Sequence, residues 1–334
     1  QCDQPIVVQR PAIAAEQRIL SAPIILWIEL TSQCPLRCRH CFIRPSIDGN
    51  GKHLPTELAL SLVRQARDMG VFKITLTGGE ALLHPDAFTV ITEINKLGLG
   101  LRLFSSGCLS SSVFERLRSH KIDTFFLSMD GMEQHHEYLR GKNSFGKLTK
   151  TIQILSAIES ISNITLSVTL DRTNYRSVKD IIAFASNNQV RTLLVRPLMT
   201  YAWTEEVSGI AFSDKAELLQ ALEYLESVGE KYNIEIQVNK LPYFPITKVT
   251  YCEDHPANAS LWHILGINDS IDCVGGNLVC GVRWDGTISP CGFLPTHQEL
   301  CRQQEKLHVD LAEQWKQSPS LTRMNCIPIN EDCR

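Results

Sequence analysis

The sequence lacks an apolar run as long as the roughly 20 residues that a membrane-spanning helix requires. Its apolar segment at residues 23–30 is short and contains Glu29, so it predicts a buried strand. The N-terminus also lacks the basic start and the apolar core of a secretory signal peptide. A chain that begins with glutamine indicates a trimmed form of a longer protein. We therefore expect no membrane partner.

The chain also carries little net charge. Its formal charge is −3 at pH 7 and its pI is near 6.4, so composition gives no support for nucleic-acid binding. Twelve cysteines in 334 residues are too sparse for a disulfide-stapled scaffold. They concentrate at 34–41 and 273–333, which is typical of metal binding in a reducing cytosol. We expect a cytoplasmic protein without a nucleic-acid partner.

The sequence does contain a regular alternation of β-prone runs and amphipathic segments. Strands are predicted at 24–30, 73–77, 100–105, 124–128, 164–170, 192–196 and 234–238. Helices are predicted between them, at 56–68, 86–96, 111–120, 147–158, 178–186 and 214–231. Repeated strand–helix units predict an α/β fold with a parallel sheet and right-handed crossovers. These units are too few for a closed barrel of eight, so we expect an open partial (β/α)6 barrel.

The alternation divides the chain into three parts. Residues 1–23 are an N-terminal extension, residues 24–240 the partial barrel, and residues 241–334 a small Cys-rich region. In the last part, β-prone residues flank Asp285 and Gly286, a pair typical of hairpin turns. Because chemistry in such barrels lies at the carboxyl ends of the strands, residues that directly follow a predicted strand are the candidate site.

Three cysteines directly follow the first predicted strand. Cys34, Cys38 and Cys41 stand in the spacing C-x-x-x-C-x-x-C. Three thiolates on a short loop can ligate three irons of a [4Fe–4S] cluster, and the fourth iron is then open to a small molecule. The alternatives are a structural zinc site and a set of buried thiols. Zinc sites usually combine two C-x-x-C pairs, and no partner pair lies nearby.

Gly78, Gly79 and Glu80 end the second predicted strand. Glycines leave the backbone open to a close ligand, and a carboxylate adds a hydrogen-bond acceptor. Alone, this triplet would more often be a loop turn. One strand after the cysteine triad, it supports a ligand site.

The cysteine spacing and the Gly-Gly-Glu triplet together resemble the radical S-adenosylmethionine (SAM) superfamily. The resemblance implies that the amino and carboxylate groups of SAM chelate the open iron of the cluster. One electron then cleaves SAM to a 5′-deoxyadenosyl radical. It also implies that the Gly-Gly-Glu segment contacts the SAM amino group.

The same resemblance assigns further SAM contacts at the ends of later strands. Ser106 lies where many members have a Thr-Asn-Gly segment, and Ser128 and Asp130 resemble the family's Ser-Leu-Asp-Gly. Their oxygens would bond the ribose and methionine groups. Arg140, in an Arg-Gly pair, would bind the methionine carboxylate. Helix capping or surface solvation is the alternative for each. His135 and His136 are expected to face solvent and are assigned no role.

The C-terminal cysteines resemble the auxiliary-cluster region of the SPASM and twitch branch. Cys273, Gly286 and Cys291 stand in the order and spacing that open that region. The resemblance implies at least one auxiliary [4Fe–4S] cluster. Whether there are one or two such clusters stays open. Its expected ligands are Cys273, Cys291, Cys326 and Cys333, with Cys280 and Cys301 as further candidates.

Members of this branch mostly modify peptides. The resemblance therefore implies a maturase that abstracts hydrogen from a C–H of a ribosomally made precursor peptide. A thioether, a carbon–carbon crosslink, an epimerised residue or an excised fragment would result. Epimerisation needs a thiol hydrogen donor, for which Cys252 and Cys108 are the first candidates. The implied partners are the precursor peptide and an electron donor such as flavodoxin or ferredoxin. Residues 1–23 are too short for a leader-binding domain, so a separate protein or the barrel itself would bind the leader.

Other functions stay open at this point. A tetrapyrrole or redox-cofactor maturase of the same branch fits nearly as well as a peptide maturase. A molybdenum-cofactor pterin synthase fits less well. A non-catalytic iron–sulfur carrier or peptide-binding scaffold would need no SAM site, and Gly78, Gly79 and Glu80 argue against it.

Overall fold

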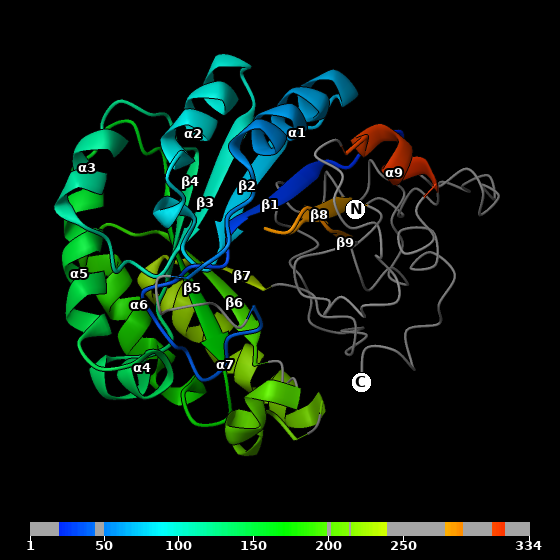
Figure 1. Cartoon of the computed structure of the whole chain (residues 1–334). Coiled ribbons are helices and arrows are strands. Elements are labelled where there is room, and N and C mark those ends of the chain that lie inside the picture. The colour runs from blue at the N-terminus through cyan, green and yellow to red at the C-terminus, as the bar shows by residue number, and fades with distance from the viewer. Residues whose placement is uncertain are drawn as a thin grey trace, which may run out of the picture.

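The computed structural model describes residues 20–43, 50–198, 202–213, 215–238, 278–289 and 309–317. Within these ranges the strands form one sheet in the order β7-β6-β5-β4-β3-β2-β1-β8-β9 (Figure 1). The strands are β1 Ile25–Thr31, β2 Lys73–Gly78, β3 Gly100–Ser105, β4 Thr124–Ser128, β5 Ile164–Leu170, β6 Thr192–Pro197, β7 Glu235–Val238, β8 Val279–Val282 and β9 Ile288–Ser289. Neighbours from β7 to β8 pair in parallel, whereas β8 and β9 pair antiparallel.

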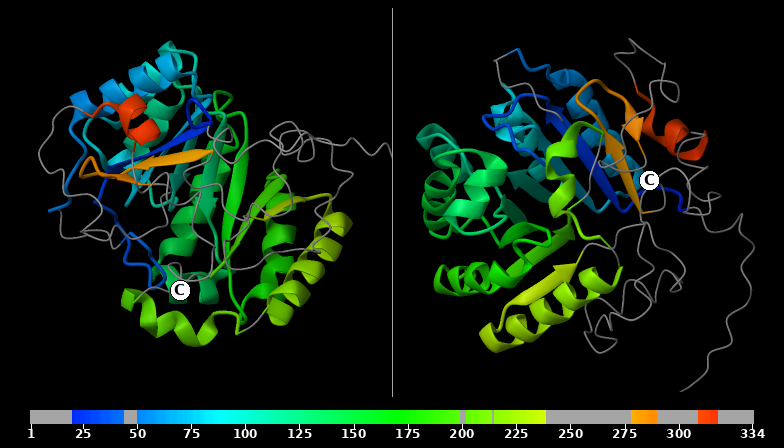
Figure 2. Two further views of the ribbon diagram at one scale, coloured as in Figure 1. Left: turned by 90° about the vertical axis from the view of Figure 1, so that its right-hand side faces the viewer. Right: turned by 90° about the horizontal axis from the view of Figure 1, so that it is seen from below.

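Helices follow the strands in the order that the sequence predicts. They are α1 Thr56–Met69, α2 Ala87–Lys96, α3 Ser111–Leu117, α4 Glu133–Arg140, α5 Ser144–Leu155, α6 Val178–Asn187, α7 Lys215–Tyr232 and α9 Leu311–Gln317. Short 3-10 helices span Ala81–Leu83, Tyr175–Ser177 and Ala202–Ile210. Figures 1 and 2 show helices α1, α2, α3, α5 and α6 packed along the outer face of the sheet, whereas α4 lies at the strand ends. The α/β partial-barrel prediction is confirmed.

The predicted strands 1 to 7 correspond to β1 to β7, and none of their ends differs by more than one residue. Four helical segments were not predicted: α4 and the 3-10 helices at Ala81–Leu83, Tyr175–Ser177 and Ala202–Ile210. The short α4 has only two apolar residues, Tyr138 and Leu139, and they are adjacent, so it has no apolar stripe at helical spacing. Its position matters because it follows β4 directly and lies over the candidate site.

Alternation along each strand separates the core from the barrel interior. On β1, Leu26, Ile28 and Leu30 are fully buried in the main hydrophobic core. The residues between them point to the opposite face of the sheet. Trp27, for example, contacts Phe104 of β3 at a ring-centroid distance of 5.5 Å. The outer face of the sheet therefore carries the apolar core, and the inner face carries mixed polar and aromatic side chains.

Part of the C-terminal region joins the same sheet. β8 pairs in parallel with β1, with Val279 opposite Ile25. The predicted hairpin is present, since Arg283 N–H donates to the Thr287 carbonyl oxygen at 2.8 Å. Gly286 has a φ of +83°, a conformation that glycine adopts without strain. The division of the chain at residue 240 stays a prediction.

Helix α9 also packs on the barrel. Trp315 is 2% exposed, and its indole Nε1–H donates to the Leu20 carbonyl oxygen at 2.7 Å. Gln65 of α1 donates from Nε2 to the Val309 carbonyl oxygen at 2.8 Å. These contacts fix the helix beside α1, as Figure 1 shows. In the described part of the chain, no helix has the length and apolarity that crossing a bilayer would take.

Candidate active site

The loop that follows β1 carries the cysteine triad. Cys34 is buried, Cys38 and Cys41 are half-buried, and all three are free thiols. Cys41 N–H donates to the Cys38 carbonyl oxygen at 3.1 Å, which closes a tight turn. Arg39 N–H donates to the carbonyl oxygen of Leu139 in α4 at 2.8 Å. The loop is therefore tied to the helix that follows β4.

The three thiols are spread along this loop. Among the residues that the structure describes, no three His, Cys, Asp or Glu side chains are grouped as a single metal ion would need. A cubane cluster takes each thiolate at a different iron rather than around one centre.

Gly78 and Gly79 let the end of β2 pack directly against the Cys loop. Gly78 has a φ of +129°, and a Cβ there would lie 2.4 Å from the Thr31 carbonyl oxygen. A Cβ on Gly79 would lie 2.2 Å from the Gln33 carbonyl oxygen and 3.0 Å from the Cys34 Cβ. The sequence predicts that these glycines expose the backbone to a ligand. In addition, they make room for the loop that carries the thiols.

Replacing Gly79 by alanine should therefore cost the protein the iron of the triad cluster, about four irons per chain. The added methyl group would displace the Gln33 backbone and shift Cys34, and real Cβ atoms do not approach a backbone atom this closely. The measurement is an iron assay on anaerobically reconstituted protein, with circular dichroism to verify folding. Gly146→Ala is the matched control, because a Cβ on Gly146 would meet nothing within 4 Å. Equal iron contents in the two variants would contradict this account of the glycine.

Glu80 lies at the centre of a buried hydrogen-bond cluster. It is 1% exposed, and its Oε2 accepts from Ser105 Oγ at 3.0 Å, Ser106 N at 2.9 Å and Ser106 Oγ at 2.8 Å. Burial raises the pKa of Glu80, although the hydrogen bonds from Ser106 and Ser105 oppose this. The Ser106 hydroxyl, predicted to contact SAM, thus donates to Glu80 in this structure. It orients the carboxylate.

Asp130 and Arg140 form a buried ion pair beside the Cys loop. Asp130 is fully buried, and its Oδ2 accepts from Arg140 Nε at 2.5 Å. Its Oδ1 accepts from the Thr169 backbone N–H at 2.8 Å. Burial alone would raise the pKa of Asp130, but the cation of Arg140 holds it well below its usual range. Both oxygens are engaged in this structure, so Asp130 supports Arg140. The predicted contact of Asp130 with SAM stays a prediction.

Arg140 also reaches the Cys loop. Its Nη1 lies 3.7 Å from Cys38 Sγ, and its Nη2–H donates to His40 Nε2 at 3.4 Å. Burial lowers the pKa of His40 to about 4, so the imidazole is neutral at pH 7 and can accept this bond. The 3.4 Å approach of His40 to Asp130 is therefore not an ion pair at that pH. The predicted role of Arg140 toward the SAM carboxylate stays a prediction.

The prediction that His135 and His136 face solvent is wrong. His136 is fully buried, and its Nδ1 accepts from the Asp130 backbone N–H at 3.4 Å. His135 Nε2 lies 3.0 Å from Asp171 Oδ2. The reason is that α4 turns this polar sequence toward the strand ends, where buried polar partners are available. Ser128 is half-buried at the end of β4, as predicted for a residue near the site.

The remaining candidate cysteines fall into three groups. Cys108 is half-buried on the loop after β3, and its N–H donates to Ser106 Oγ at 3.3 Å. Cys280 is fully buried in the apolar core on β8, and burial raises its pKa to about 12. Its role as a cluster ligand stays a prediction. Six candidates lie outside the described residues: Cys252, Cys273, Cys291, Cys301, Cys326 and Cys333.

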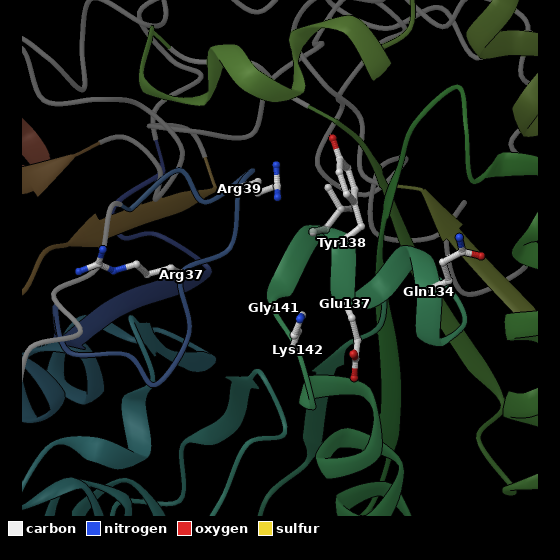
Figure 3. A pocket seen from close by; sticks show the side chains of 8 residues that line it. Arg37, Arg39, Gln134, Glu137, Tyr138, Gly141 and Lys142 are labelled. Carbon is white, nitrogen blue, oxygen red and sulfur yellow. The ribbon is translucent and has the colours of Figure 1, made fainter.

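A pocket of about 490 Å³ lies between the Cys loop and α4 (Figure 3). Its lining residues are Arg37, Arg39, Gln134, Glu137, Tyr138, Leu139, Gly141 and Lys142. Figure 3 shows Arg39 of the loop beside Tyr138 of α4. The guanidinium carbon of Arg39 lies 4.6 Å from the centre of the Tyr138 ring. The pocket therefore adjoins the triad. The Cys loop bounds it on one side, and α4 with the residues that follow it bounds the other.

Two buried polar atoms next to the Cys loop have no hydrogen-bond partner in the described part of the chain. They are Glu80 Oε1 and His40 Nδ1. Buried polar atoms are paired as a rule, so these atoms mark a place where a polar ligand would bind. A free carboxylate oxygen suits an ammonium group. The three thiols and Glu80 thus fit an iron–sulfur cluster with SAM beside it.

Comparison with known proteins agrees with this geometry. Residues 28–185 match the family model of the Radical SAM superfamily. This part of the chain is a radical SAM domain. The protein is an enzyme of this class, as the triad and the Gly-Gly-Glu triplet predict.

Two curated relatives span most of this radical SAM protein. The PqqA peptide cyclase of Methylorubrum extorquens is 24% identical over 318 residues, which is 95% of this chain and 78% of the relative. A tungsten-containing aldehyde ferredoxin oxidoreductase cofactor-modifying protein of Pyrococcus furiosus is 24% identical over 291 residues, 84% of this chain and 74% of the relative. Both similarities extend beyond the part that matches the family model.

The fold is also similar to that of SuiB from Streptococcus suis. The crystal structure of SuiB bound to precursor peptide SuiA has a TM-score of 0.72 at 20% sequence identity. The match covers 93% of this radical SAM chain and 69% of SuiB. At this identity the similarity establishes the fold.

Sequence reasoning missed His40 and Asn174. His40 lies within the triad itself, so its position between Cys38 and Cys41 was an available signal. Asn174 donates from Nδ2 to the carbonyl oxygens of Asp130 and Thr169, both at 2.8 Å. It lies 44 residues from Asp130 in sequence, and no motif marks it.

Proposed function

We propose that this radical SAM enzyme modifies a ribosomally made precursor peptide through hydrogen abstraction from a C–H. The observation that carries the proposal is the packing of the three-thiol loop against Glu80, whose Oε1 is buried without a partner. Support for a peptide substrate comes from the relatives, since one is a peptide cyclase and SuiB has been crystallised with a precursor peptide.

In this proposal Cys34, Cys38 and Cys41 hold the [4Fe–4S] cluster, and Glu80 accepts a hydrogen bond from the SAM ammonium group. When bound, the cluster and SAM supply a 5′-deoxyadenosyl radical, and the protein supplies positioning and exclusion of water. Ser106 fixes the orientation of the Glu80 carboxylate. Arg140 places a buried cation next to Cys38 and thereby steadies the loop.

Further parts of the proposal concern the rest of the molecule. Ser128 and Arg140 are proposed to contact SAM, and Cys108 or Cys252 to donate hydrogen if the product is an epimer. The proposal also includes an auxiliary [4Fe–4S] cluster in residues 241–334. Its proposed partners are an electron donor and a separate leader-binding protein. We also propose a cytoplasmic location, where thiol-ligated clusters stay reduced.

Glu80→Gln is expected to weaken SAM binding about ten- to hundredfold, the usual effect of losing one charge-assisted hydrogen bond. The glutamine oxygen can still accept from Ser105 and Ser106, but an NH2 group then replaces Oε1 and faces the SAM ammonium. The measurement is a SAM titration of anaerobically reconstituted protein, followed by detection of 5′-deoxyadenosine and of peptide mass change.

The matched control for this substitution is Glu115→Gln. Glu115 lies on α3 with its side chain 75% exposed, so the same chemical change occurs far from the site. SAM affinity that is equal in the two variants would show that Glu80 does not contact SAM. If the wild-type protein cleaves SAM but modifies no precursor peptide, the proposed peptide substrate is contradicted, whereas the proposed SAM site stands.

A second candidate function is maturation of a redox cofactor or tetrapyrrole. It is favoured by the name of the Pyrococcus furiosus relative, which is described as cofactor-modifying. The two functions differ in their substrates. Mass change in a precursor peptide supports the first, and SAM cleavage stimulated by a small cofactor precursor instead of a peptide supports the second.

A further inference from the structure

Four neighbouring strands place one residue each at the same level of the barrel interior. Trp27 of β1 lies opposite Thr75 of β2, Thr75 opposite Arg102 of β3, and Arg102 opposite Thr124 of β4. The residues that flank them along the strands, such as Leu101, belong to the outer core. Paired positions in a parallel sheet share a face, so this row of side chains lies on the inner face.

Arg102 is a half-buried cation without a counter-charge among the described residues. In the part of the chain that the structure describes, it has no hydrogen bond and no ion pair, and its guanidinium carbon lies 4.9 Å from the centre of the Phe126 ring. Burial lowers the pKa of Arg102 to about 10, and no carboxylate counteracts this. The group is still charged at pH 7. A charge that is partly removed from water and has no partner is unfavourable, and a ligand of opposite charge would relieve that cost.

The neighbour of Arg102 on β2 is also unsatisfied. Thr75 is fully buried, and its Oγ1 has no hydrogen-bond partner among the described residues. Buried hydroxyl groups are normally paired. A guanidinium and a hydroxyl at paired positions of adjacent strands together offer several donors to a single acceptor group.

The guanidinium of Arg102 is turned toward the end of the barrel that carries the radical SAM site. It stacks on Phe126, which pairs with Phe104, two residues further along β3 than Arg102. The Phe104 and Phe126 rings are stacked at 4.3 Å with an interplanar angle of 6°. β3 then ends at Ser105, which bonds Glu80. At about 3.3 Å per residue, Arg102 starts about 10 Å below that end.

We propose that Arg102, assisted by Thr75, binds the carboxylate of an acidic side chain in the peptide substrate. This inference rests on the proposed function and names a substrate feature: an Asp or Glu near the residue that is modified. A planar guanidinium takes a carboxylate through two parallel hydrogen bonds, which gives direction as well as charge. The stacked Phe126 and Phe104 rings hold the guanidinium in place and offer an apolar wall to the neighbouring peptide residue.

The test uses calorimetric titrations of reconstituted protein with SAM present. The probes are acetate and three acetylated hexapeptides: Glu-Gly-Glu-Gly-Glu-Gly as an amide, its Gln analogue as an amide, and the Gln analogue with a free C-terminus. We expect the wild type to bind the Glu peptide at least about tenfold more tightly than the Gln amide, as one charge-assisted bond predicts. Arg102→Gln should abolish that preference, and Thr75→Val should reduce it.

Arg116→Gln is the matched control. Arg116 also stacks on a phenylalanine, with its guanidinium carbon 4.0 Å from the Phe88 ring centre, but it is exposed on α3. This variant should keep the preference for the Glu peptide. Thermal melting of Arg102→Gln verifies that this variant folds. If Arg102→Gln is unstable, the binding preference of Thr75→Val still tests the proposal.

The outcomes separate this inference from the proposed function. Equal binding of the Glu and Gln amides by wild type would overturn the inference while SAM cleavage and peptide modification could still stand. Preference for the free C-terminus alone, or for acetate alone, would overturn the assignment to an acidic side chain. Loss of SAM binding in Arg102→Gln would assign the cation to SAM instead. Arg102-dependent binding of the Glu peptide in a protein that modifies no peptide would support the site and contradict the function.

Discussion

Replacing Cys34, Cys38 and Cys41 together by alanine is expected to abolish 5′-deoxyadenosine formation. The loop after β1 is the segment that offers three thiols, and each iron that it anchors needs its own thiolate. Without the anchors no open iron can hold SAM. The expected effect is complete loss of SAM cleavage by the reconstituted protein, measured by chromatography of the nucleoside product. Cleavage that persists in the triple variant would contradict the assignment of the triad.

Cys280→Ala is the matched control for the loss of a thiol. Cys280 is fully buried in the core on β8, so its replacement removes sulfur without touching the Cys loop. This variant should still form 5′-deoxyadenosine. The triple variant also tests the auxiliary cluster, because one complete cluster would leave about four irons per chain. A triple variant without iron, or with zinc alone, would contradict the auxiliary cluster, and about eight irons would indicate two.

The sequence predicts the barrel well because its strands carry a strong local signal. On β2, Ile74 and Leu76 are in the core and alternate with Thr75, a pattern that defines a strand without reference to the rest of the chain. The pairing of β8 with β1 is different, since it joins segments about 250 residues apart in sequence. No local pattern specifies such a contact. The hairpin turn at Gly286 was local, and it was predicted.

In the candidate site, too, features marked by local sequence were predicted, and contacts between distant segments were not. The triad and Glu80 were found because their residues are adjacent in sequence and follow predicted strands. The partners of Asp130 were not found, because Arg140 and Thr169 come from two other segments and meet it only after folding. Sequence reasoning therefore placed Asp130 in the site but did not reveal its protein partners, and its predicted contact with SAM stays a prediction. The contact with Arg140 depends on α4, a helix whose sequence has no apolar stripe.

Asp130→Ala is expected to lower the free energy of unfolding by about 3–5 kcal/mol, the usual cost of breaking a buried ion pair by removing one partner. The substitution would leave the Arg140 guanidinium, 11% exposed, without its carboxylate and the Thr169 N–H without its acceptor. Urea unfolding followed by circular dichroism measures the change. The exposed pair Arg64–Glu93, at 2.7 Å, provides the control, and Glu93→Gln should cost less than about 1 kcal/mol.

The double variant Asp130→Ala/Arg140→Met decides whether the buried charge is the cause. Methionine fills much of the space of the arginine stem and carries no charge, so it removes the unpaired cation that the single variant creates. We expect the double variant to regain most of the lost stability. The part not regained is the hydrogen bond from the Thr169 N–H to Asp130, which both variants lack. A double variant as unstable as Asp130→Ala would mean that the carboxylate acts mainly through Thr169 and the strand ends. Recovery of stability together with loss of iron would instead show that Arg140 is needed to hold Cys38 in position, 3.7 Å from its Nη1.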